Sequence, residues 1–149
     1  MSVGQYCNRD VVIVTEDTSI REAADLMRTH SVGTLVVVKE ENRGRVPVGL
    51  LTDRDIVVEL LAEGVDLESV CVGDVMSYEL LAVPEQADLL ETVKQMRSKG
   101  VRRVPVVDQD GTLTGILALD DLIEVLSEVL VDVSRLIARE QHREREKVR

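Results

Sequence analysis

Two stretches of this sequence repeat one pattern: GQYCNRDVVIVTEDTSIREAADLMRTHSVGTLVVV at residues 4–38 and GDVMSYELLAVPEQADLLETVKQMRSKGVRRVPVV at residues 73–107. They align without a gap at an offset of 69 residues, and their residues match in kind almost throughout. Beyond a turn that is three residues longer in the first copy, the offset becomes 66, and VGLLTDRDIVVELL from Val48 aligns with TGILALDDLIEVLS from Thr114. The repeat decides the fold class before any other argument, because both copies must form the same supersecondary unit.

The first copy begins with a predicted strand and a predicted helix. Residues 11–14 are mostly β-branched, which is typical of a strand, and Ser19 with Glu22 has the spacing of a capping box. From Ile20 to Met27, apolar side chains recur at intervals of three and four residues. This periodicity places them on one face of a helix.

The remainder of the unit is predicted to be two strands and a second helix. Apolar runs at 35–38 and 46–51 flank a polar turn that contains glycine, which indicates an antiparallel pair. Thr52 or Asp53 can cap a helix that runs to about Ala62. The second copy repeats this scheme, with strands at 80–83, 104–107 and 113–117, a helix capped by Asp88, and a helix from about Asp120.

The order β-α-β-β-α, found twice, predicts an α+β fold of two βαββα units packed sheet to sheet with pseudo-twofold symmetry. One unit alone would leave an apolar sheet face in water, whereas two units bury it against each other and leave two clefts between them. We expect a first domain at 1–66, a second domain at 67–130 and a charged helical extension at 131–149.

Composition argues against several classes of partner. The formal charge of −10, from 28 acidic and 18 basic side chains, repels nucleic acid and anionic lipid. The chain has no Phe or Trp on which bases could stack. No apolar run approaches the roughly 18 residues of a membrane span. Cys7 and Cys71 are the only cysteines, and no signal peptide is apparent, so we expect a cytoplasmic protein.

The predicted last helix continues beyond the repeat. Apolar residues from Ile123 to Ile137 step by three, four, three and four, which is a heptad-like spacing. This row of side chains either packs along the body of the protein or pairs across a twofold axis in a homodimer. Mixed charges after Ile137 indicate a solvated extension.

A family resemblance follows from four motifs. GLLTDRDIV at 49–57 and GILALDDLI at 115–123 are similar to the signature that closes a cystathionine β-synthase (CBS) domain. CNRDVVIV and DVMSYELLAV resemble the segment that opens one, so the resemblance covers about residues 4–127. It implies a tandem CBS pair, or Bateman module, often dimeric, that binds AMP, ADP, ATP or S-adenosylmethionine as a regulatory ligand and controls another protein. No catalytic domain is recognised in this sequence, so we expect the effector to be a separate protein.

The resemblance also implies a set of ligand-binding residues. Asp55 and Asp121 would accept hydrogen bonds from ribose hydroxyls, a task that suits a carboxylate. Thr52, just before a helix start, would favour a phosphate. The adjacent Asp53 would cap the helix or contact the ribose. The second copy has Ala118 in place of Thr52, so we expect the two clefts to differ in affinity.

Further residues complete this expected site. Arg102 and Arg103 would contact phosphate, since a guanidinium offers a bidentate grip, and the first copy has no basic residue in register with them. The remaining predicted contacts are apolar, with backbone facing the adenine edge at Val11 and Leu80, and walls at Val32 and Val101.

Each of these residues also has a purely structural interpretation. Asp55 and Asp121 could simply complement helix dipoles, and the arginines could be surface charges. Cys7, Cys71, His30 and His142 lack the spacing of a zinc site, and no nucleophile–base arrangement is recognisable, so we predict no metal site, no required cofactor and no enzymatic activity. The alternative function is a ligand-free interaction module that acts through its dimer surface and C-terminal helix.

Overall fold

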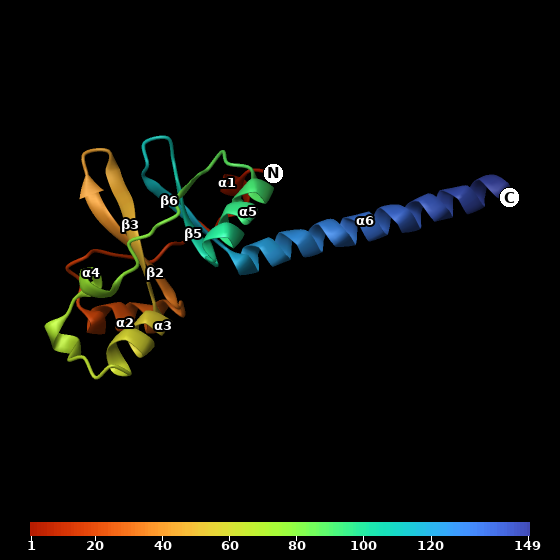
Figure 1. Ribbon diagram of the computed structural model, residues 1–149. Coiled ribbons are helices and arrows are strands. Elements are labelled where there is room, and N and C mark those ends of the chain that lie inside the picture. Colours follow the sequence, from red (N-terminus) through yellow and green to blue (C-terminus); the bar gives the residue numbers. More distant parts are fainter.

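The structure, a computed structural model, describes all 149 residues as two similar repeats followed by a long helix (Figure 1). The first repeat consists of β1 (Ile13–Val14), α2 (Ile20–His30), β2 (Thr34–Glu41), β3 (Gly44–Thr52), α3 (Asp53–Asp55) and the π-helical turn η1 (Ile56–Leu61). The second consists of β4 (Val83–Pro84), α5 (Leu89–Lys99), β5 (Arg103–Val107), β6 (Leu113–Ala118) and α6 (Leu119–Val148). Three short helices precede or join them: α1 (Val3–Tyr6), the 3-10 turn η2 (Leu67–Ser69) and α4 (Val72–Val75).

Each repeat forms its own three-stranded sheet, in the orders β1-β2-β3 and β4-β5-β6. The two hairpins are antiparallel, which confirms the prediction, and the short first strand of each sheet runs parallel to the middle strand. Strands 11–14 and 80–83 were predicted with the wrong limits. Only Ile13–Val14 and Val83–Pro84 are strand residues in the structure, and the residues just before them line cavities.

Side-chain caps fix where the helices begin, as the spacing predicted. The Ser19 hydroxyl accepts a hydrogen bond from the amide of Glu22, at 3.1 Å. The Thr52 hydroxyl accepts one from the amide of Asp55, and the Asp88 carboxylate does the same at the start of α5. Each cap satisfies a backbone N–H that lacks a partner within its own helix.

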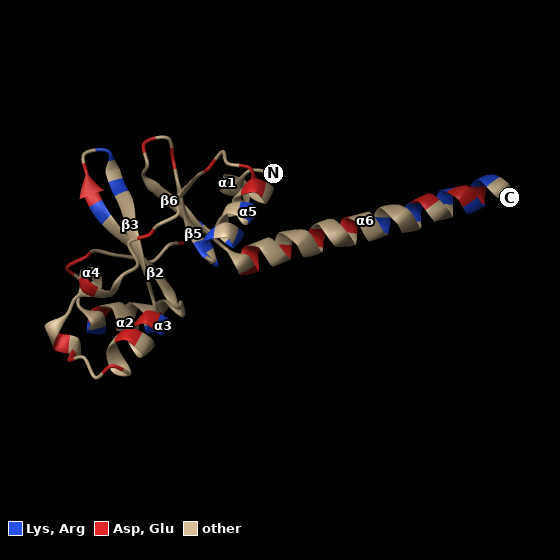
Figure 2. Ribbon diagram, in the orientation of Figure 1, with Lys and Arg blue, Asp and Glu red and all other residues tan.

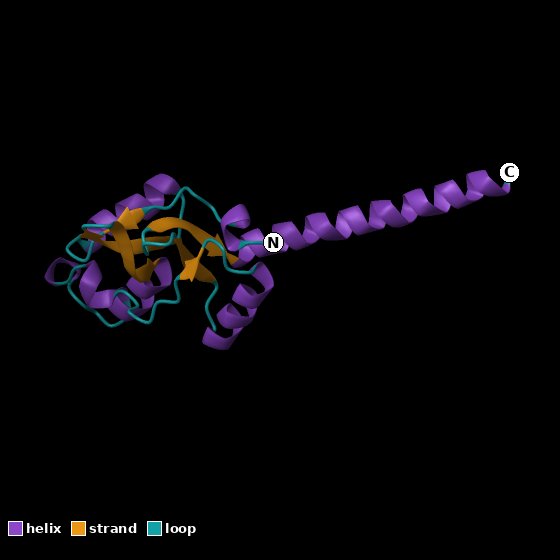
Figure 3. Cartoon of the chain, turned by 90° about the horizontal axis from the view of Figure 1, so that it is seen from above, coloured by secondary structure: helices purple, strands orange, loops and turns teal.

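The two sheets lie between the helices of the two repeats (Figure 3). Leu35 and Val37 of β2 are fully buried against the helices of the first repeat. Val36 points to the opposite face, as alternation along a strand requires, and is also fully buried; the equivalent Pro105 is buried in the second sheet. Since both faces of each central strand are covered and β3 contacts β6, the predicted sheet-to-sheet packing is confirmed.

The segment that opens each repeat packs on the other repeat. Val3 of α1 is fully buried in the second core, and its amide donates to the carbonyl of Ala87 at 2.9 Å. Val72 of α4 is fully buried in the first core, and its amide donates to the carbonyl of Thr18 at 2.9 Å. This exchange ties the two repeats together, because each core is completed by a segment from the neighbouring sequence copy.

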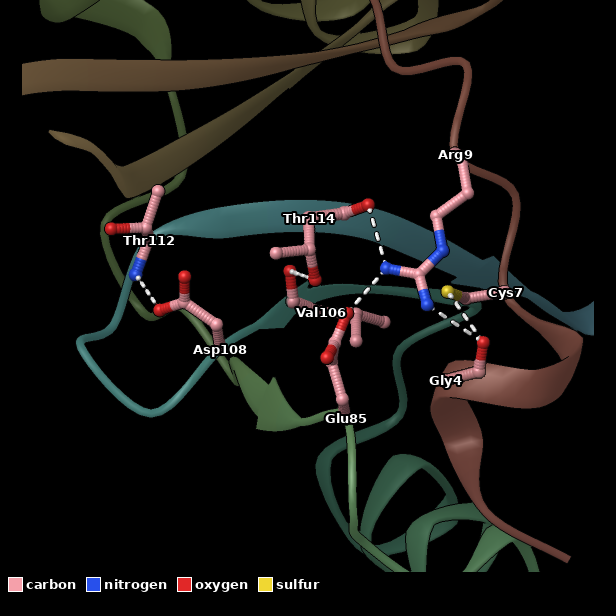
Figure 4. A network of polar contacts seen from close by, with 8 residues as sticks. All are labelled: Gly4, Cys7, Arg9, Glu85, Val106, Asp108, Thr112 and Thr114. Carbon is pink, nitrogen blue, oxygen red and sulfur yellow. Dashed lines mark hydrogen bonds and ion pairs between the residues drawn. The ribbon is translucent and has the colours of Figure 1, made fainter.

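Arg9 anchors the N-terminal segment to the second repeat (Figure 4). Its guanidinium donates to the carboxylate of Glu85, to the carbonyl of Thr114 at 3.2 Å, and to the carbonyl of Gly4 at 2.9 Å. The hydrogen bond from Arg9 lowers the pKa of Glu85 below its ordinary value and raises the pKa of Arg9. Burial raises the pKa of the nearby Cys7 thiol.

Because the pKa of Glu85 is lowered in the folded protein, its ion pair stabilises the fold above the ordinary Glu value of 4.5. That contribution is lost as pH falls through the folded pKa. The variant Glu85→Gln is therefore expected to be less stable than the parent at neutral pH, by a difference that disappears at low pH. Urea midpoints measured from neutral pH to about pH 3 check this, with the exposed Glu63→Gln as control. A difference that does not change with pH would contradict it.

The helix α6 begins in the second core and then leaves the body of the protein (Figure 1). Leu122 and Val125 are buried, whereas every residue from Leu126 to the C-terminus is exposed. Of the two interpretations of the heptad-like row, packing along the body is wrong, because α6 points away from it. No helix is both long and apolar enough to span a bilayer.

Candidate functional site

Two cavities lie between the repeats. The first, here called the Asp55 cleft, has a volume of about 380 Å³ and is lined by Thr34, Leu50, Thr52, Asp53, Arg54, Asp55, Ser77, Val101, Arg102 and Arg103. A hollow of about 650 Å³ adjoins it, sharing Ser77 and Val101 and adding Glu79, Leu80, Leu81 and Lys99. Volumes of a few hundred Å³ are typical of small-molecule sites.

The second cavity, here called the Asp121 cleft, has a volume of about 290 Å³. Its lining residues are Asn8, Asp10, Val11, Val12, Ser31, Val32, Gly33, Thr34, Arg103, Ile116, Ala118, Asp120 and Asp121. Most of them are the repeat equivalents of residues in the Asp55 cleft or its adjoining hollow: Val11 corresponds to Leu80, Val32 to Val101, and Ala118 to Thr52. The pseudo-twofold symmetry of the fold therefore produces two related clefts.

Each cleft combines parts of both repeats. In the Asp55 cleft, the end of β3 and the start of α3 face the segment before β4 and the turn before β5. In the Asp121 cleft, the end of β6 and the start of α6 face the segment before β1 and the turn before β2. Neither cleft exists in one repeat alone, so the packing of the two sheets determines the shape of both.

One oxygen of each key aspartate is used within the protein. Oδ2 of Asp55 accepts from the backbone amide of Thr52 at 2.9 Å, and Oδ2 of Asp121 accepts from the amide of Ala118 at 2.9 Å. The structural interpretation of these residues as helix-start acids is therefore confirmed. Oδ1 of each has no hydrogen-bond partner within the chain and remains available as an acceptor at the cleft.

The two clefts differ in charge and in polar side chains. Arg54, Arg102 and Arg103 face Asp53 and Asp55 in the Asp55 cleft, where cationic side chains outnumber carboxylates. The Asp121 cleft has three carboxylates, on Asp10, Asp120 and Asp121, and Arg103 as its one cation. The position of the Thr52 hydroxyl is taken by the Ala118 methyl group. An anionic ligand group therefore finds a better electrostatic match in the Asp55 cleft.

Thr34 and Arg103 lie at the centre of the site and line both clefts. They occupy equivalent positions in the repeat, so the pseudo-twofold axis passes between them. The hydroxyl of Thr34 is the one buried side-chain oxygen in the structure without a hydrogen-bond partner. No hydrogen bond or ion pair within the chain holds the Arg103 guanidinium, which leaves this side chain free to reach a ligand in either cleft.

The structure brings nine of the ten predicted residues to the two clefts and the tenth, Leu80, to the hollow that adjoins the Asp55 cleft. Thr52, Asp53, Asp55, Val101, Arg102 and Arg103 line the Asp55 cleft, and Leu80 lines the hollow beside it. Val11, Val32 and Asp121 line the Asp121 cleft, with Arg103 again.

In the Asp55 cleft, sequence reasoning missed four lining residues: Thr34, Leu50, Arg54 and Ser77. The repeat alignment carries a signal for Thr34, because this residue is in register with the predicted Arg103. Arg54 lies between the predicted Asp53 and Asp55, within the motif GLLTDRDIV.

The structure contains no group of three or more His, Cys, Asp or Glu side chains placed to share a metal ion. Cys71 instead contacts the carboxylate of Asp74, at 3.4 Å. Cys7 lies 3.8 Å from the carbonyl of Gly4.

A scan against protein-family models matches the CBS domain twice, at residues 3–62 and 72–128. This chain belongs to the CBS domain family. Its two repeats are thus a pair of CBS domains, and the motifs at Gly49–Val57 and Gly115–Ile123 lie within the two matched regions.

Curated relatives support this assignment over most of the chain. The CBS domain-containing protein YhcV of Bacillus subtilis is 39% identical over 121 residues, which are 81% of this chain and 82% of the relative. Hypoxic response protein 1 of Mycobacterium tuberculosis is 34% identical over the same shares. An uncharacterized protein of Methanopyrus kandleri is 36% identical over 84% of this chain, which spans 62% of the length of that relative.

Solved structures have the same architecture. Hypoxic response protein I, crystallised with two coordinated zinc ions, superposes with a TM-score of 0.71 at 32% identity, covering 83% of this chain and 98% of that chain. An uncharacterized protein from Pyrococcus horikoshii gives a TM-score of 0.72 at 27% identity, over 83% and 90% of the chains. A CBS domain pair in complex with 5′-methylthioadenosine and S-adenosyl-L-methionine shares the fold, with a TM-score of 0.74 at 22% identity.

Proposed function

We propose that this CBS pair is a regulatory module that binds an adenosine-containing ligand between its repeats and is not itself an enzyme. The observation that carries the proposal is the placement of Asp55 and Asp121 at equivalent sites, each with one carboxylate oxygen unused at a cavity. A carboxylate can accept hydrogen bonds from both hydroxyl groups of a ribose diol. The CBS pair solved with two adenosine compounds shows that this fold accommodates such ligands.

The walls of the clefts suit the base of such a ligand. Val101 lies on the Asp55 cleft, with Leu80 in the adjoining hollow, and Val11 and Val32 lie on the Asp121 cleft. All four side chains are partly exposed in the absence of a ligand, so a purine that covers them removes apolar surface from water. Backbone groups beside them can bond the edge of the base.

The charge difference assigns different ligands to the two clefts. Arg102 and Arg103 with the Thr52 hydroxyl favour a phosphorylated nucleotide such as AMP, ADP or ATP in the Asp55 cleft. The acidic Asp121 cleft favours an uncharged or cationic adenosine compound, of which S-adenosylmethionine is one, because a carboxylate attracts its sulfonium and ammonium groups.

Regulation follows from where the ligand lies. Each cleft joins the two repeats, so a ligand that prefers one relative packing of the repeats shifts the population toward that packing. A separate effector protein would then bind to the changed surface. The chain supplies no nucleophile with an adjacent base at either cleft, and the proposal needs none.

A thermal-shift screen against AMP, ADP, ATP, adenosine and S-adenosylmethionine tests this function. A ligand at about 100 times its Kd adds about 2.7 kcal/mol to the free energy of unfolding. For a chain of this size that is a rise in Tm of roughly 5–10 °C. We expect Asp55→Asn to weaken nucleotide binding about 10- to 100-fold, because it removes a charged acceptor. Asparagine can still accept from the Thr52 amide, so the helix cap is kept.

Three controls make this test specific. Asp25→Asn changes an exposed aspartate of α2 outside the clefts and should leave every shift intact. The 2′-deoxy analogue should bind the parent protein less tightly than the ribonucleotide does. To Asp55→Asn, the analogue and the ribonucleotide should bind equally tightly. No shift with any adenosine compound, or equal shifts in parent and variants, would overturn the proposal in favour of a ligand-free interaction module.

A further inference from the structure

The two clefts share one arginine. Arg103 begins β5 and pairs in the ladder with Ala118, at the end of β6. Its side chain lines the Asp121 cleft, which contains Ala118, and also lines the Asp55 cleft on the other side of the pseudo-twofold axis. Figure 2 shows basic residues where β5 begins, beside the acidic first turn of α6. A single positive charge therefore lies between two sites that can each use it.

The repeat supplies this charge only once. The residue equivalent to Arg103 in the first copy is Thr34, which also lines both clefts but carries no charge. The Thr34 hydroxyl has no hydrogen-bond partner within the chain, and neither has the Arg103 guanidinium. Arg103 is half-buried, and no internal polar contact fixes its side chain toward either cleft. A ligand can therefore decide which cleft the guanidinium occupies.

The position of this charge changes the electrostatic balance of the two clefts in opposite directions. With Arg103 counted in each, the Asp55 cleft has three arginines against two carboxylates, and the Asp121 cleft has one arginine against three carboxylates. A phosphate bound in the Asp55 cleft attracts the guanidinium, which can form bidentate hydrogen bonds to it. The Asp121 cleft is then left with three carboxylates and no cation. It becomes more attractive to a cationic ligand and less attractive to a second phosphate.

We propose that Arg103 couples the two clefts, so that an anionic nucleotide in the Asp55 cleft strengthens the binding of a cationic adenosine compound in the Asp121 cleft. This inference rests on the proposed function, from which it takes the ligands of the two clefts. Linkage requires the reverse effect to be equal, so the cationic ligand strengthens nucleotide binding by the same factor. Two phosphorylated ligands, in contrast, compete for the one guanidinium. The module therefore responds most strongly when both kinds of ligand are present.

Calorimetric titration of S-adenosylmethionine, with and without saturating ATP, measures this coupling. Its size is limited because Arg103 is partly exposed and the solvent screens its charge. We expect ATP to lower the Kd of S-adenosylmethionine about 5- to 20-fold, in the lower part of the range typical of coupled sites. Adenosine is the matched control ligand, because it has the base and ribose of ATP but no phosphate to attract Arg103. It should not lower that Kd.

The variant Arg103→Gln tests whether this residue carries the coupling. Saturating ATP is expected to change the Kd of S-adenosylmethionine less than about twofold in this variant. Direct attraction between the two bound ligands would survive the change, so the variant separates that effect from the one proposed. Arg102→Gln is the matched control, because it removes the same charge from a residue that lines only the Asp55 cleft. It should weaken ATP binding but, once ATP is saturating, leave the effect on S-adenosylmethionine intact.

The outcomes distinguish failure of the coupling from failure of the proposed function. If S-adenosylmethionine or ATP does not bind the parent protein, the ligands assigned under the proposed function are wrong, and the coupling fails with them. If both bind and ATP leaves the Kd of S-adenosylmethionine unchanged or raises it, the coupling alone is overturned. It is also overturned if Arg103→Gln keeps the full effect, or if Arg102→Gln removes it. A lowered Kd in the parent protein that is lost in Arg103→Gln and kept in Arg102→Gln is the result expected.

Discussion

Replacement of Leu117 by alanine is expected to lower the free energy of unfolding by about 2–5 kcal/mol. Leu117 lies on β6 with no exposed surface, packed in the second core. Truncation removes buried methyl groups and leaves a cavity that the surrounding strands can fill only in part. Urea denaturation followed by circular dichroism measures the loss. The matched control is Leu90→Ala, because Leu90 is 55% exposed on α5 and its truncation leaves no cavity. Equal effects of the two changes would contradict this prediction.

The equivalent residue in the first repeat, Leu51, is also fully buried, and Leu51→Ala should cost a similar amount. Both variants should still unfold in one cooperative step. The reason is the exchange of opening segments, in which α1 completes the second core and α4 completes the first. Two separate transitions, seen by probes placed in different repeats, would show that the cores are independent.

Gly115→Ala is expected to cost about 1–3 kcal/mol by overpacking. A β-carbon at Gly115 would lie 2.7 Å from Sγ of Cys7 and 2.9 Å from the backbone oxygen of Asn8. The backbone of Asn8 cannot move away easily. Its amide donates to the carbonyl of Ile116, and its carbonyl accepts from the amide of Ile116, both at 2.9 Å. Gly49 is the equivalent residue, and a β-carbon there would lie 2.8 Å from the backbone oxygen of Ser77.

This substitution should also affect ligand binding. Asn8 and Ile116 line the Asp121 cleft and not the Asp55 cleft, so displacement of Asn8 is expected to weaken binding in the Asp121 cleft only. Chemical denaturation and calorimetric titration of Gly115→Ala measure the two effects. Gly64→Asn is the control, since Gly64 has open space around it and asparagine tolerates its positive φ of 69°. A Gly115→Ala protein as stable as the parent would show that the close contact relaxes freely.

Much of the architecture could be predicted from sequence, because it depends on residues close together in the chain. The capping residues Ser19, Thr52 and Asp88 all lie at the predicted positions. Strand ends were less predictable, since Val11 and Leu80 have strand-like sequences but line cavities. Whether such a residue joins a ladder depends on a partner strand that is distant in sequence.

The candidate site was predicted residue by residue but not as an arrangement. Thr52 comes from the first repeat and Arg102 from the second, and the repeat alignment alone associates each with its own copy. The structure places them in one cleft, which makes that cleft the basic one. It also places Arg103 at both clefts, although the sequence indicates only a cation beside a strand.

The sequence by itself determined the repeat, the α+β units and the helix starts, and its resemblance to a family predicted ten site residues, nine of which line the clefts. Only the tertiary structure decided that α1 and α4 cross to the opposite repeat, how the site residues divide between two clefts, and that α6 leaves the body. The physical reason is how far apart in the sequence the interacting residues lie. Capping and periodicity act within a few residues, whereas the docking of Val3 beside a core 80 or more residues away depends on which apolar surfaces fit together once both sheets exist.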